Sequence, residues 1–313
     1  MENFIEKSEI LFLYEGKFTV PNGDPFTGEQ RYDDETKHIL VSDVRIKRFV
    51  RDYFIDKYKN KDKYKVFVFN DKSQVAEGSK ESGASARMQT LWGGNKPKDK
   101  KLYESAALKL LQECIDVRLF GGISTEKEAA VNITGPVQFA LLNPSLNKTD
   151  LRIHQNTAVF SSSADKSRGA IGTTTVVPYA LNQIHGWINP YSALNSKLTE
   201  DDINELFSAM WNSINNSNTR SKSNQSSVLL IQIVYNNAND KLYGTDKLIS
   251  IISEKEEEQI REMEDYRFDF SRLGVAASSE KVKEIRFYTE IPEIENAITA
   301  LNKLKIKPIT LLK

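Results

Sequence analysis

The chain has 313 residues, of which 39% are hydrophobic and 27% are charged, and its 43 basic and 43 acidic residues leave no net charge. These values are ordinary for a water-soluble globular protein. No stretch approaches the roughly 18 consecutive apolar residues that a membrane span needs, and a single cysteine, Cys114, excludes an internal disulfide. The N-terminus lacks the pattern of a signal peptide, so we expect a cytoplasmic protein with no membrane contact.

The first third of the chain begins with an apolar run and a dense turn signal. Residues 8–15, "SEILFLYE", are rich in aliphatic and aromatic side chains and predict a buried strand. The following "VPNGDP" at 20–25 combines proline, Asn-Gly and Asp-Pro, which is typical of a turn. Ser42 or Asp43 can cap the next helix, whose apolar positions recur at helical spacing.

Charge is segregated along the chain, although its total is zero. Between Arg45 and Lys65 there are nine basic and three acidic residues, a net charge of +6. Between Glu254 and Asp265 there are seven acids and two bases, a net charge of −5. Because the position of charge matters more than its sum, the basic helix is a candidate surface for a polyanion. The alternative is two solvated helices.

The middle of the chain predicts two long polar insertions between shorter regular elements. A strand is expected at 64–70, a polar insertion at 71–101 and an apolar helix at 102–119. Cys114 falls in the apolar pattern of that helix, where a buried, unreactive thiol is expected. "GPVQFALLN" predicts a strand, and residues 145–175 predict a protruding hairpin with glycine and serine near its tip.

The C-terminal half alternates strands and helices. The segment 176–191 predicts a strand, and Thr199 precedes an amphipathic helix. "VLLIQIVY" predicts a central strand, the acidic segment after Ser253 a helix, and residues 283–312 a strand, a helix and a strand. These elements predict an α+β fold. One layout is a modified ferredoxin-like or RNA-recognition-type sheet, backed by helices and decorated by loops.

The sequence contains few candidates for catalysis or metal binding. His38, His154 and His185 lie in separate segments without metal-ligand spacing, and zinc, phosphate-loop and nucleophile-elbow motifs are absent. Asp33 and Asp34 belong to a carboxylate cluster that could hold a metal for phosphodiester cleavage, but a solvated loop is the simpler interpretation. We therefore expect no enzyme, no cofactor and no metal.

The basic helix fits a row of phosphates better than it fits a catalytic site. Lys47 and Arg51 are one turn apart, so they share a helical face at a spacing comparable to that of successive phosphates. Such contacts are independent of base sequence. Two basic insertions can add contacts, although solubilising charge is the alternative for both. Their basic residues include Arg87, Lys96, Lys98, Lys100 and Lys101 in the first, and Arg152, Lys166 and Arg168 in the second.

Five motifs occur in an order that resembles a known family. They are "PNGDP", "LVSDVRIKRFVRDY", "DVRLFGG", "GPVQFALLNPSL" and "VPYALNQIHGWINP", and the resemblance covers residues 8–195. Each motif is weak alone. The ordered set resembles the Cas7 family of the RAMP superfamily, the backbone subunit of type I CRISPR surveillance complexes (Cascade), and the type I-B, Csh-like variant is the most similar.

The resemblance implies one domain of residues 1–313 with an RNA-recognition-type palm, a finger-like insertion at 71–101 and a protruding thumb at 146–176. It implies a non-catalytic subunit of antiviral defence that oligomerises along CRISPR RNA as a helical filament and presents the guide for pairing with target DNA. The implied partners are further copies of the chain, the large subunit, the subunit at the guide 5′ end, the guide-processing subunit and a recruited helicase-nuclease.

The resemblance also assigns residues, with Lys47 and Arg51 as the leading contacts to guide phosphates. Phe160 or Ile171 is expected to act as the wedge of the thumb. The finger residues Arg87, Lys96 and Lys98 are expected to face the target strand. The expected RNA contacts are Lys47, Arg48, Arg51, Arg45, Arg118, Gly121, Gly122, Arg152, Phe160, Lys166, Arg168 and Ile171.

The sequence departs from the family pattern at two places. Val20 stands where relatives often have asparagine, and Thr173–Thr175 stand where many relatives carry a basic run, which leaves a contact at each place open. The alternative function is a metal-dependent ribonuclease of the type III backbone kind that uses Asp33 or Asp34.

Overall fold

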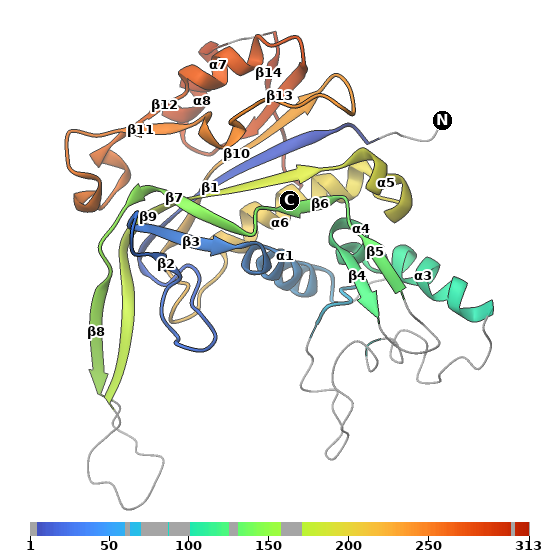
Figure 1. The fold of residues 1–313 in the computed structure, drawn as a ribbon, viewed down its shortest axis with the longest axis horizontal. Coiled ribbons are helices and arrows are strands. Elements are labelled where there is room, and N and C mark those ends of the chain that lie inside the picture. Colours follow the sequence, from blue (N-terminus) through green and yellow to red (C-terminus); the bar gives the residue numbers. More distant parts are fainter. Residues whose placement is uncertain are drawn as a thin grey trace, which may run out of the picture.

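The computed structural model describes residues 5–59, 63–69, 87, 101–124, 131–157, 171–301 and 304–312. Helices and strands are mixed along the chain, and most strands join one central sheet with antiparallel and parallel pairs (Figure 1). The predicted mixture of strands and helices is therefore confirmed. The strands expected at 8–15 and 228–235 pair with each other at the centre of the sheet.

The central sheet runs from the C-terminal strands at one edge to short N-terminal strands at the other. Its order is β14-β13-β10-β1-β9-β7-β3-β2, with β6 and β8 also pairing with β9. The strands of this sheet are β1 (Ser8–Thr19), β2 (Tyr32–Asp33), β3 (His38–Ser42), β6 (Val137–Phe139), β7 (Leu142–Lys148), β8 (Arg152–Thr157), β9 (Ile171–Ile188), β10 (Gln225–Tyr235), β13 (Val282–Tyr288) and β14 (Ile306–Pro308).

Helices cover both faces of the sheet (Figure 1). Even-numbered residues of β1, such as Phe12, share a core with α1 and α6, and odd-numbered ones, such as Leu13, share a core with α7 and α8. This division follows because successive side chains of a strand point to opposite faces. The α-helices are α1 (Asp43–Tyr58), α3 (Lys101–Glu113), α4 (Ile115–Phe120), α5 (Pro190–Ser196), α6 (Glu200–Asn215), α7 (Ser271–Ala277) and α8 (Pro292–Leu301).

Strand β9 belongs both to the sheet and to a projecting hairpin (Figure 1). Val176 pairs with Arg152 of β8, and the next residue, Val177, pairs with Thr19 of β1. The strand therefore passes directly from the hairpin to the sheet, and only Pro178, just inside the sheet, has no partner in the register. A protruding hairpin is what the sequence at 145–175 predicts, and its tip, 158–170, lies outside the described residues.

The prediction of a strand at 64–70 is wrong for the residues that the structure describes there. Residues 63–69 form turns and bends, with one bridge from Lys65 to Cys114. The reason is a buried carboxylate. Asp116 accepts the backbone N–H groups of Phe67 at 2.8 Å and Val68 at 3.0 Å, so these donors do not enter a ladder. Val66 and Phe67 are buried, Val68 is exposed, and the run packs as an irregular segment.

The helix predicted at 102–119 is divided into α3 and α4 at Cys114, whose backbone is extended. The break occurs because residue 115 donates its N–H to the carbonyl of Lys65, outside the helix. Cys114 is buried as expected, and burial raises the pKa of its thiol to about 12. A small two-stranded sheet follows α4, formed by β4 (Gly121–Ser124) and β5 (Val131–Thr134).

The acidic segment after Ser253 is not an α-helix as predicted. It forms two 3₁₀ turns, η3 (Glu257–Gln259) and η4 (Met263–Asp265), between the short paired strands β11 (Ser250–Ile252) and β12 (Arg267–Asp269). An α-helix here would place like charges four residues apart, as at Glu254 and Glu258, which destabilises it. One further 3₁₀ turn is η2 (Thr245–Lys247).

Candidate nucleic-acid interface

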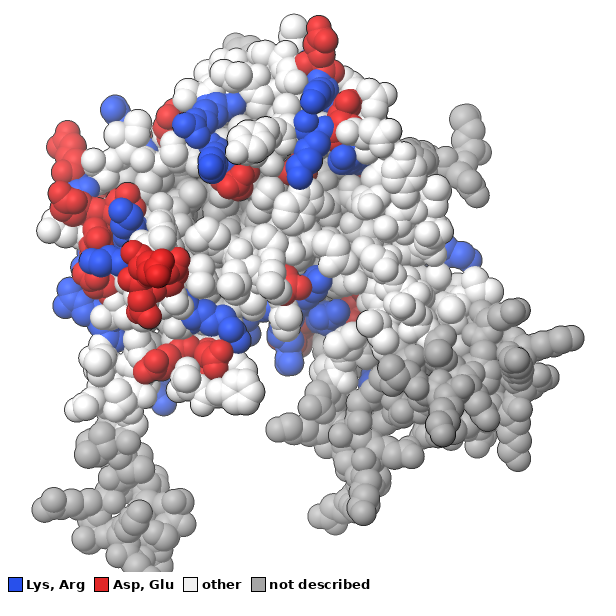
Figure 2. All heavy atoms as spheres, viewed as in Figure 1, with Lys and Arg blue, Asp and Glu red and all other residues white. Residues whose placement is uncertain are grey.

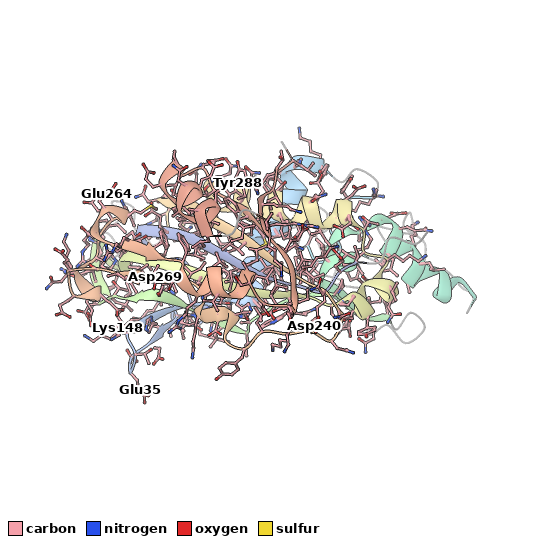
Figure 3. All side chains as sticks on the ribbon, turned by 90° about the horizontal axis from the view of Figure 1, so that it is seen from above. Glu35, Lys148, Asp240, Glu264, Asp269 and Tyr288 are labelled. Carbon is pink, nitrogen blue, oxygen red and sulfur yellow. The ribbon has the colours of Figure 1, made fainter. Side chains whose placement is uncertain are left out.

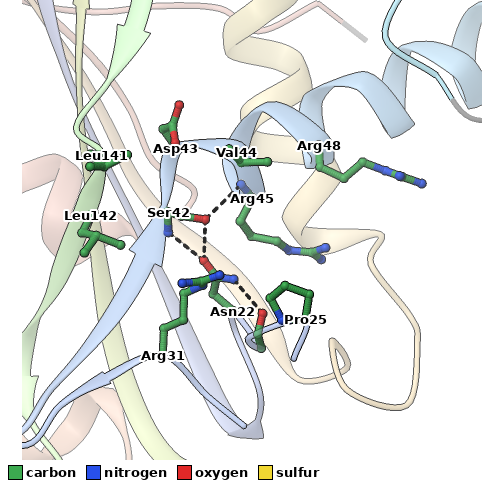
Figure 4. A pocket seen from close by; sticks show the side chains of 11 residues that line it. Asn22, Pro25, Arg31, Ser42, Asp43, Val44, Arg45, Arg48, Leu141 and Leu142 are labelled. Carbon is green, nitrogen blue, oxygen red and sulfur yellow. Dashed lines mark hydrogen bonds between the residues drawn. The ribbon is translucent and has the colours of Figure 1, made fainter. Parts of the chain in front are cut away.

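A pocket of about 540 Å³ lies at the N-terminal end of α1 (Figure 4). Three arginines line it: Arg31 from the loop after β1, and Arg45 and Arg48 from the helix. Leu141 and Leu142, at the start of β7, give it an apolar wall. Cationic groups beside an apolar wall suit a ligand that carries both a phosphate and a ring, as a nucleotide does.

The turn-rich loop at 20–25 builds this pocket by fixing the start of the helix. The side-chain oxygen of Asn22 accepts hydrogen bonds from the backbone N–H and the hydroxyl of Ser42, at 2.7 and 2.8 Å. The Ser42 hydroxyl in turn accepts the N–H of Arg45 and caps α1, as predicted. The Asn22 N–H is held by the Gln30 side chain at 2.8 Å. The turn motif thus positions the first basic residue of the helix.

Arg45 is a cation without an acidic partner among the described residues. Its guanidinium stacks on the ring of Phe49 at 3.7 Å, and its buried Nε has no hydrogen-bond partner there. Burial lowers the pKa of this guanidinium. A partly buried cation without a carboxylate partner is costly, so a bound anion would relieve this cost.

A second buried cation lies near Arg45. Lys222, in the turn before β10, donates to the backbone carbonyl of Val20 and forms no ion pair among the described residues. Burial, and then the charge of Arg45, lowers the pKa of the Lys222 ammonium to about 8. Lys222 therefore brings a basic group to the turn-rich loop from a segment 202 residues away. These two cations make this end of α1 electropositive.

The other two arginines of the pocket have partners that solvent screens. Arg48 pairs with Asp52 at 2.6 Å and is 57% exposed, and Arg31 pairs with Asp24 at 3.1 Å. The pKa of the Asp24 carboxyl is held low mainly by the backbone N–H of Phe26. Exposed ion pairs contribute little stability, so both arginines can exchange these carboxylates for a phosphate at low cost.

Lys47 and Arg51 lie on a different face of α1 and point toward the protein. Lys47 donates to Asp43 at 3.1 Å and to Gln138 at 3.0 Å, and Arg51 donates to Asp116 at 3.0 Å. Their side chains are only 13% and 12% exposed. The structure therefore separates the basic residues of the helix into two sets, and it brings Arg45 and Arg48, not the two leading candidates, to the pocket.

Arg118 and Gly121 have structural roles that the sequence did not reveal. Arg118 is 4% exposed and donates to both carboxylate oxygens of Asp202, at 2.9 and 2.8 Å. Gly121 has a φ of 82°, and a Cβ there would lie 2.1 Å from the carbonyl oxygen of Ile133. Gly122 has ordinary space around it. Both Arg118 and Gly121 are thus required by the packing of α4 against its neighbours.

The remaining expected contacts divide between described and undescribed segments. Arg152 is exposed on β8, and Thr173–Thr175 pair with the same strand. Arg87 is buried and donates to the carbonyl of Val66 at 2.6 Å, so it points inward rather than toward a target strand. Ile171 begins β9, but its side chain is not described. Phe160, Lys166, Arg168, Lys96 and Lys98 lie outside the described residues.

The candidate acids and histidines form no metal site among the described residues, where no group of three possible ligands occurs. Asp33 accepts the hydroxyl of Thr36 at 2.6 Å, and this bond lowers the pKa of its carboxyl. The neighbouring Glu35 projects from the tip of the turn (Figure 3). His185 bonds the buried Glu9 at 2.7 Å, a contact between β9 and β1.

Comparisons with known proteins agree with the architecture. The family described as CRISPR-associated protein Cas7 matches residues 6–271. The chain belongs to the Cas7 family. CRISPR-associated protein Cas7 of Haloferax volcanii is 26% identical over 290 residues, which are 86% of this chain and 82% of that protein. A chain of a solved CRISPR RNA-guided surveillance complex, pre-nicking, superimposes with a TM-score of 0.52 at 12% identity, over 94% of this chain and 99% of that one.

Membership of the Cas7 family confirms the resemblance seen in the ordered motifs. Sequence reasoning missed Arg31 and Lys222, because neither stands in a periodic or charged run. Asn22 had a signal, the Asn-Gly turn, but its bonds to Ser42 depend on a contact across 20 residues. Within the described residues no helix is long and apolar enough to cross a bilayer.

Proposed function

We propose that this Cas7-family chain is a non-catalytic backbone subunit that binds CRISPR guide RNA through the pocket at the start of α1. The observation that carries the proposal is Arg45, a partly buried guanidinium without a carboxylate partner among the described residues, in a pocket that it shares with two further arginines. A phosphate of the guide would supply the missing negative charge. The binding is independent of base sequence, which leaves the bases free to pair.

The finer architecture follows from the same proposal. The sheet is the RNA-recognition-type palm, residues 71–101 are the finger and residues 146–176 are the thumb of a single domain. Copies line up along the guide as a filament of a type I-B complex in the cytoplasm, and the guide pairs with target DNA. The projecting hairpin of β8 and β9, with exposed Arg152, supports the assignment of the thumb. The other Cascade subunits and a helicase-nuclease are the proposed partners.

The test is the salt dependence of RNA binding by the full-length chain. Arg45→Ala with Arg48→Ala should weaken binding to unrelated guide sequences by a similar factor. The slope of log K against log salt should fall by about 0.7 for each single-strand phosphate that the variant no longer neutralises, because fewer counterions are released. Fluorescence anisotropy with labelled guide RNA at several salt concentrations measures both quantities.

Two further double variants complete this experiment. Lys283→Ala with Lys307→Ala removes the same charge from the far edge of the sheet and should leave the slope unchanged. Lys47→Ala with Arg51→Ala tests the contacts that the sequence favoured. An unchanged slope for the Arg45 and Arg48 variant would contradict the assignment of the pocket.

No described residue favours the ribonuclease alternative. Asp33 is engaged by Thr36 in its own turn, and the described residues contain no cluster that could hold a metal ion. Matched RNA and magnesium, added to the assembled complex, should therefore give no regularly spaced cuts. Cleavage that Asp33→Ala abolishes would overturn the non-catalytic assignment.

A further inference from the structure

A second concave surface, between β12 and α8, lies over the opposite face of the sheet from α1. This groove encloses about 510 Å³, and most of its lining is apolar or aromatic. The rings of Tyr266 and Phe268 meet edge to face at 5.4 Å, and those of Phe268 and Phe270 stack at 5.4 Å. Ile291 and Ile294, at the start of α8, form the facing wall. A rigid aromatic floor of this kind suits an apolar side chain.

The edge of the groove is acidic. Glu264 and Glu293 line it, with Arg267 as its single basic residue. Neither glutamate forms an ion pair with a described residue, although most acidic residues near the α1 pocket do. Figure 2 shows carboxylates gathered on the side of the molecule where the segment between β11 and β12 lies. Exposed acids next to lining residues add to this charge: Glu262, Glu290 and Glu295.

The aromatic rings of the groove also lack cations. Elsewhere in the protein, a lysine or arginine lies over several aromatic rings, such as those of Phe49, Tyr53 and Phe120. In the part of the chain that the structure describes, no cation lies over the rings of Tyr266, Phe268 or Phe270. Electron-rich ring faces beside such carboxylates attract a cation. The same negative charge repels a nucleic-acid phosphate.

We propose that this groove docks a protein segment that is positively charged and inserts one aliphatic or aromatic side chain. The floor buries the apolar side chain, and Glu264 and Glu293 pair with flanking lysines or arginines of the partner. The groove is separate from the pocket at α1, because Tyr266, Phe270 and Ile294 pack on the opposite face of the sheet from the apolar side of α1. RNA and partner therefore bind at the same time.

The probe for this groove is a dye-labelled peptide, Lys-Lys-Trp-Leu-Lys-Lys with blocked ends, added to the full-length chain. Two control peptides replace either the Trp-Leu pair by Ser-Ser or every lysine by glutamate. We expect the probe to bind at least tenfold more tightly than either control, because the groove needs both the apolar side chain and the charge. Fluorescence anisotropy measures each dissociation constant.

Substitutions in the protein test whether the probe peptide binds in the groove. Glu264→Lys with Glu293→Lys should weaken probe binding at least tenfold, and so should Ala297→Gln, which fills part of the groove from an exposed helical position. Glu280→Lys reverses an exposed charge that does not line the groove and should have no effect. Guide RNA binding should be the same in all four proteins, so failure here is distinguishable from failure of the proposed RNA interface.

Three results would overturn the proposal. The first is a Ser-Ser peptide that binds as well as the probe, which would mean nonspecific charge attraction. The second is guide RNA that displaces the probe, which would assign the groove to nucleic acid. The third is self-association of the chain that the Glu264→Lys and Glu293→Lys substitutions abolish in sedimentation, which would assign the groove to a second copy.

Discussion

Two arginine–aspartate pairs differ in what surrounds them, and this difference decides what each residue does. Arg118 and Asp202 are 4% and 0% exposed, whereas Arg48 and Asp52 are 57% and 43% exposed. Removing one partner from a buried pair leaves an uncompensated charge in the interior and costs about 3–5 kcal/mol. An exposed pair contributes about 0–1 kcal/mol. Arg118 therefore stabilises the fold, and Arg48 is available to a ligand.

Replacing Arg118 by methionine should lower the free energy of unfolding by about 3–5 kcal/mol, because the buried Asp202 loses its partner. Arg48→Met is the matched control and should cost less than about 1 kcal/mol. Urea unfolding followed by circular dichroism measures both values. Similar losses for the two variants would contradict the structural role of Arg118.

Lys222 should make stability depend on pH in the alkaline range. The pKa of its ammonium is about 8 in the folded chain, below the value of about 10.4 expected when unfolded. The unfolded chain binds more protons between these values, so the free energy of unfolding rises with pH from 8 to about 10.4. Below pH 8 both states are protonated and the penalty of the buried charge is fully present.

Lys222→Met removes this dependence. The variant should gain stability relative to the wild-type chain at pH 7, and the difference should shrink as pH approaches 10, because the wild-type lysine becomes neutral there. Urea midpoints at pH 7, 8, 9 and 10 measure the trend. A difference that does not change with pH would show that Lys222 is not strained by burial.

For single residues, the sequence predicts where charged side chains lie along a helix but not which side chains they pair with. The periodicity of α1 correctly predicted the buried residues Phe49, Val50 and Phe54 and the cap Ser42, but Val44, which it also placed among the apolar positions, is exposed. It could not show that Lys47 and Arg51 turn inward, because Arg51 pairs with Asp116, 65 residues away. Arg118 finds Asp202 across 84 residues. Such contacts depend on tertiary packing, which a local pattern does not contain.

Elements with strong periodicity were predicted, and elements held by single polar contacts were not. α6 begins at Thr199 with a capping box and buries the expected apolar face. The apolar run at 64–70 resembles a strand, but the Asp116 carboxylate takes its backbone donors. The acidic segment lacks the alternation of charge that stabilises a helix. Local propensity therefore fails where a distant side chain or charge repulsion decides the backbone.

The junction of α4 with the β4–β5 pair should tolerate substitution at Gly122 in β4 and not at Gly135, which follows β5. A Cβ at Gly135 would lie 2.0 Å from the backbone of Phe120, whereas a Cβ at Gly122 would lie 3.6 Å from Val117. Gly135→Ala should therefore cost about 3 kcal/mol or more, because backbone must move, and Gly122→Ala should be nearly neutral. Thermal unfolding of the two variants measures the contrast.

The Gly122→Ala variant also tests RNA binding. Since Gly122→Ala should leave the fold intact, it tests the expected close approach of guide RNA to this turn. Weaker RNA binding with an unchanged melting temperature would support the approach. A melting temperature that falls as far as that of Gly135→Ala would contradict the space that the structure shows around Gly122.

For the whole molecule, the sequence predicts the mixture of strands and helices but not their order in the sheet. β1 lies between β9 and β10, which follow it by more than half the chain. A period of two tells which face of a strand is buried and does not tell which strand is its neighbour.

The projecting hairpin should be separable from the fold. Arg152 and Val176 pair directly, so residues 153–175 can be replaced by a two-residue Asn-Gly turn, which suits a hairpin. The shortened chain should melt within a few degrees of the wild type, because residues 153–157 and 171–175 pair only with each other. It should still bind short RNA but no longer form multi-copy assemblies on long guides, as measured by sedimentation.

The continuity of β9 has a mechanical consequence. The arm and the body share one strand, and at the transition Val176 is held by β8 and Val177 by β1, which restricts swinging of the arm about this strand. Tension or compression at the arm would reach the middle of the sheet directly. If copies of the chain bind side by side along a polymer, the stiffness of this arm would set the distance between them. Each copy would then cover a constant length of that polymer.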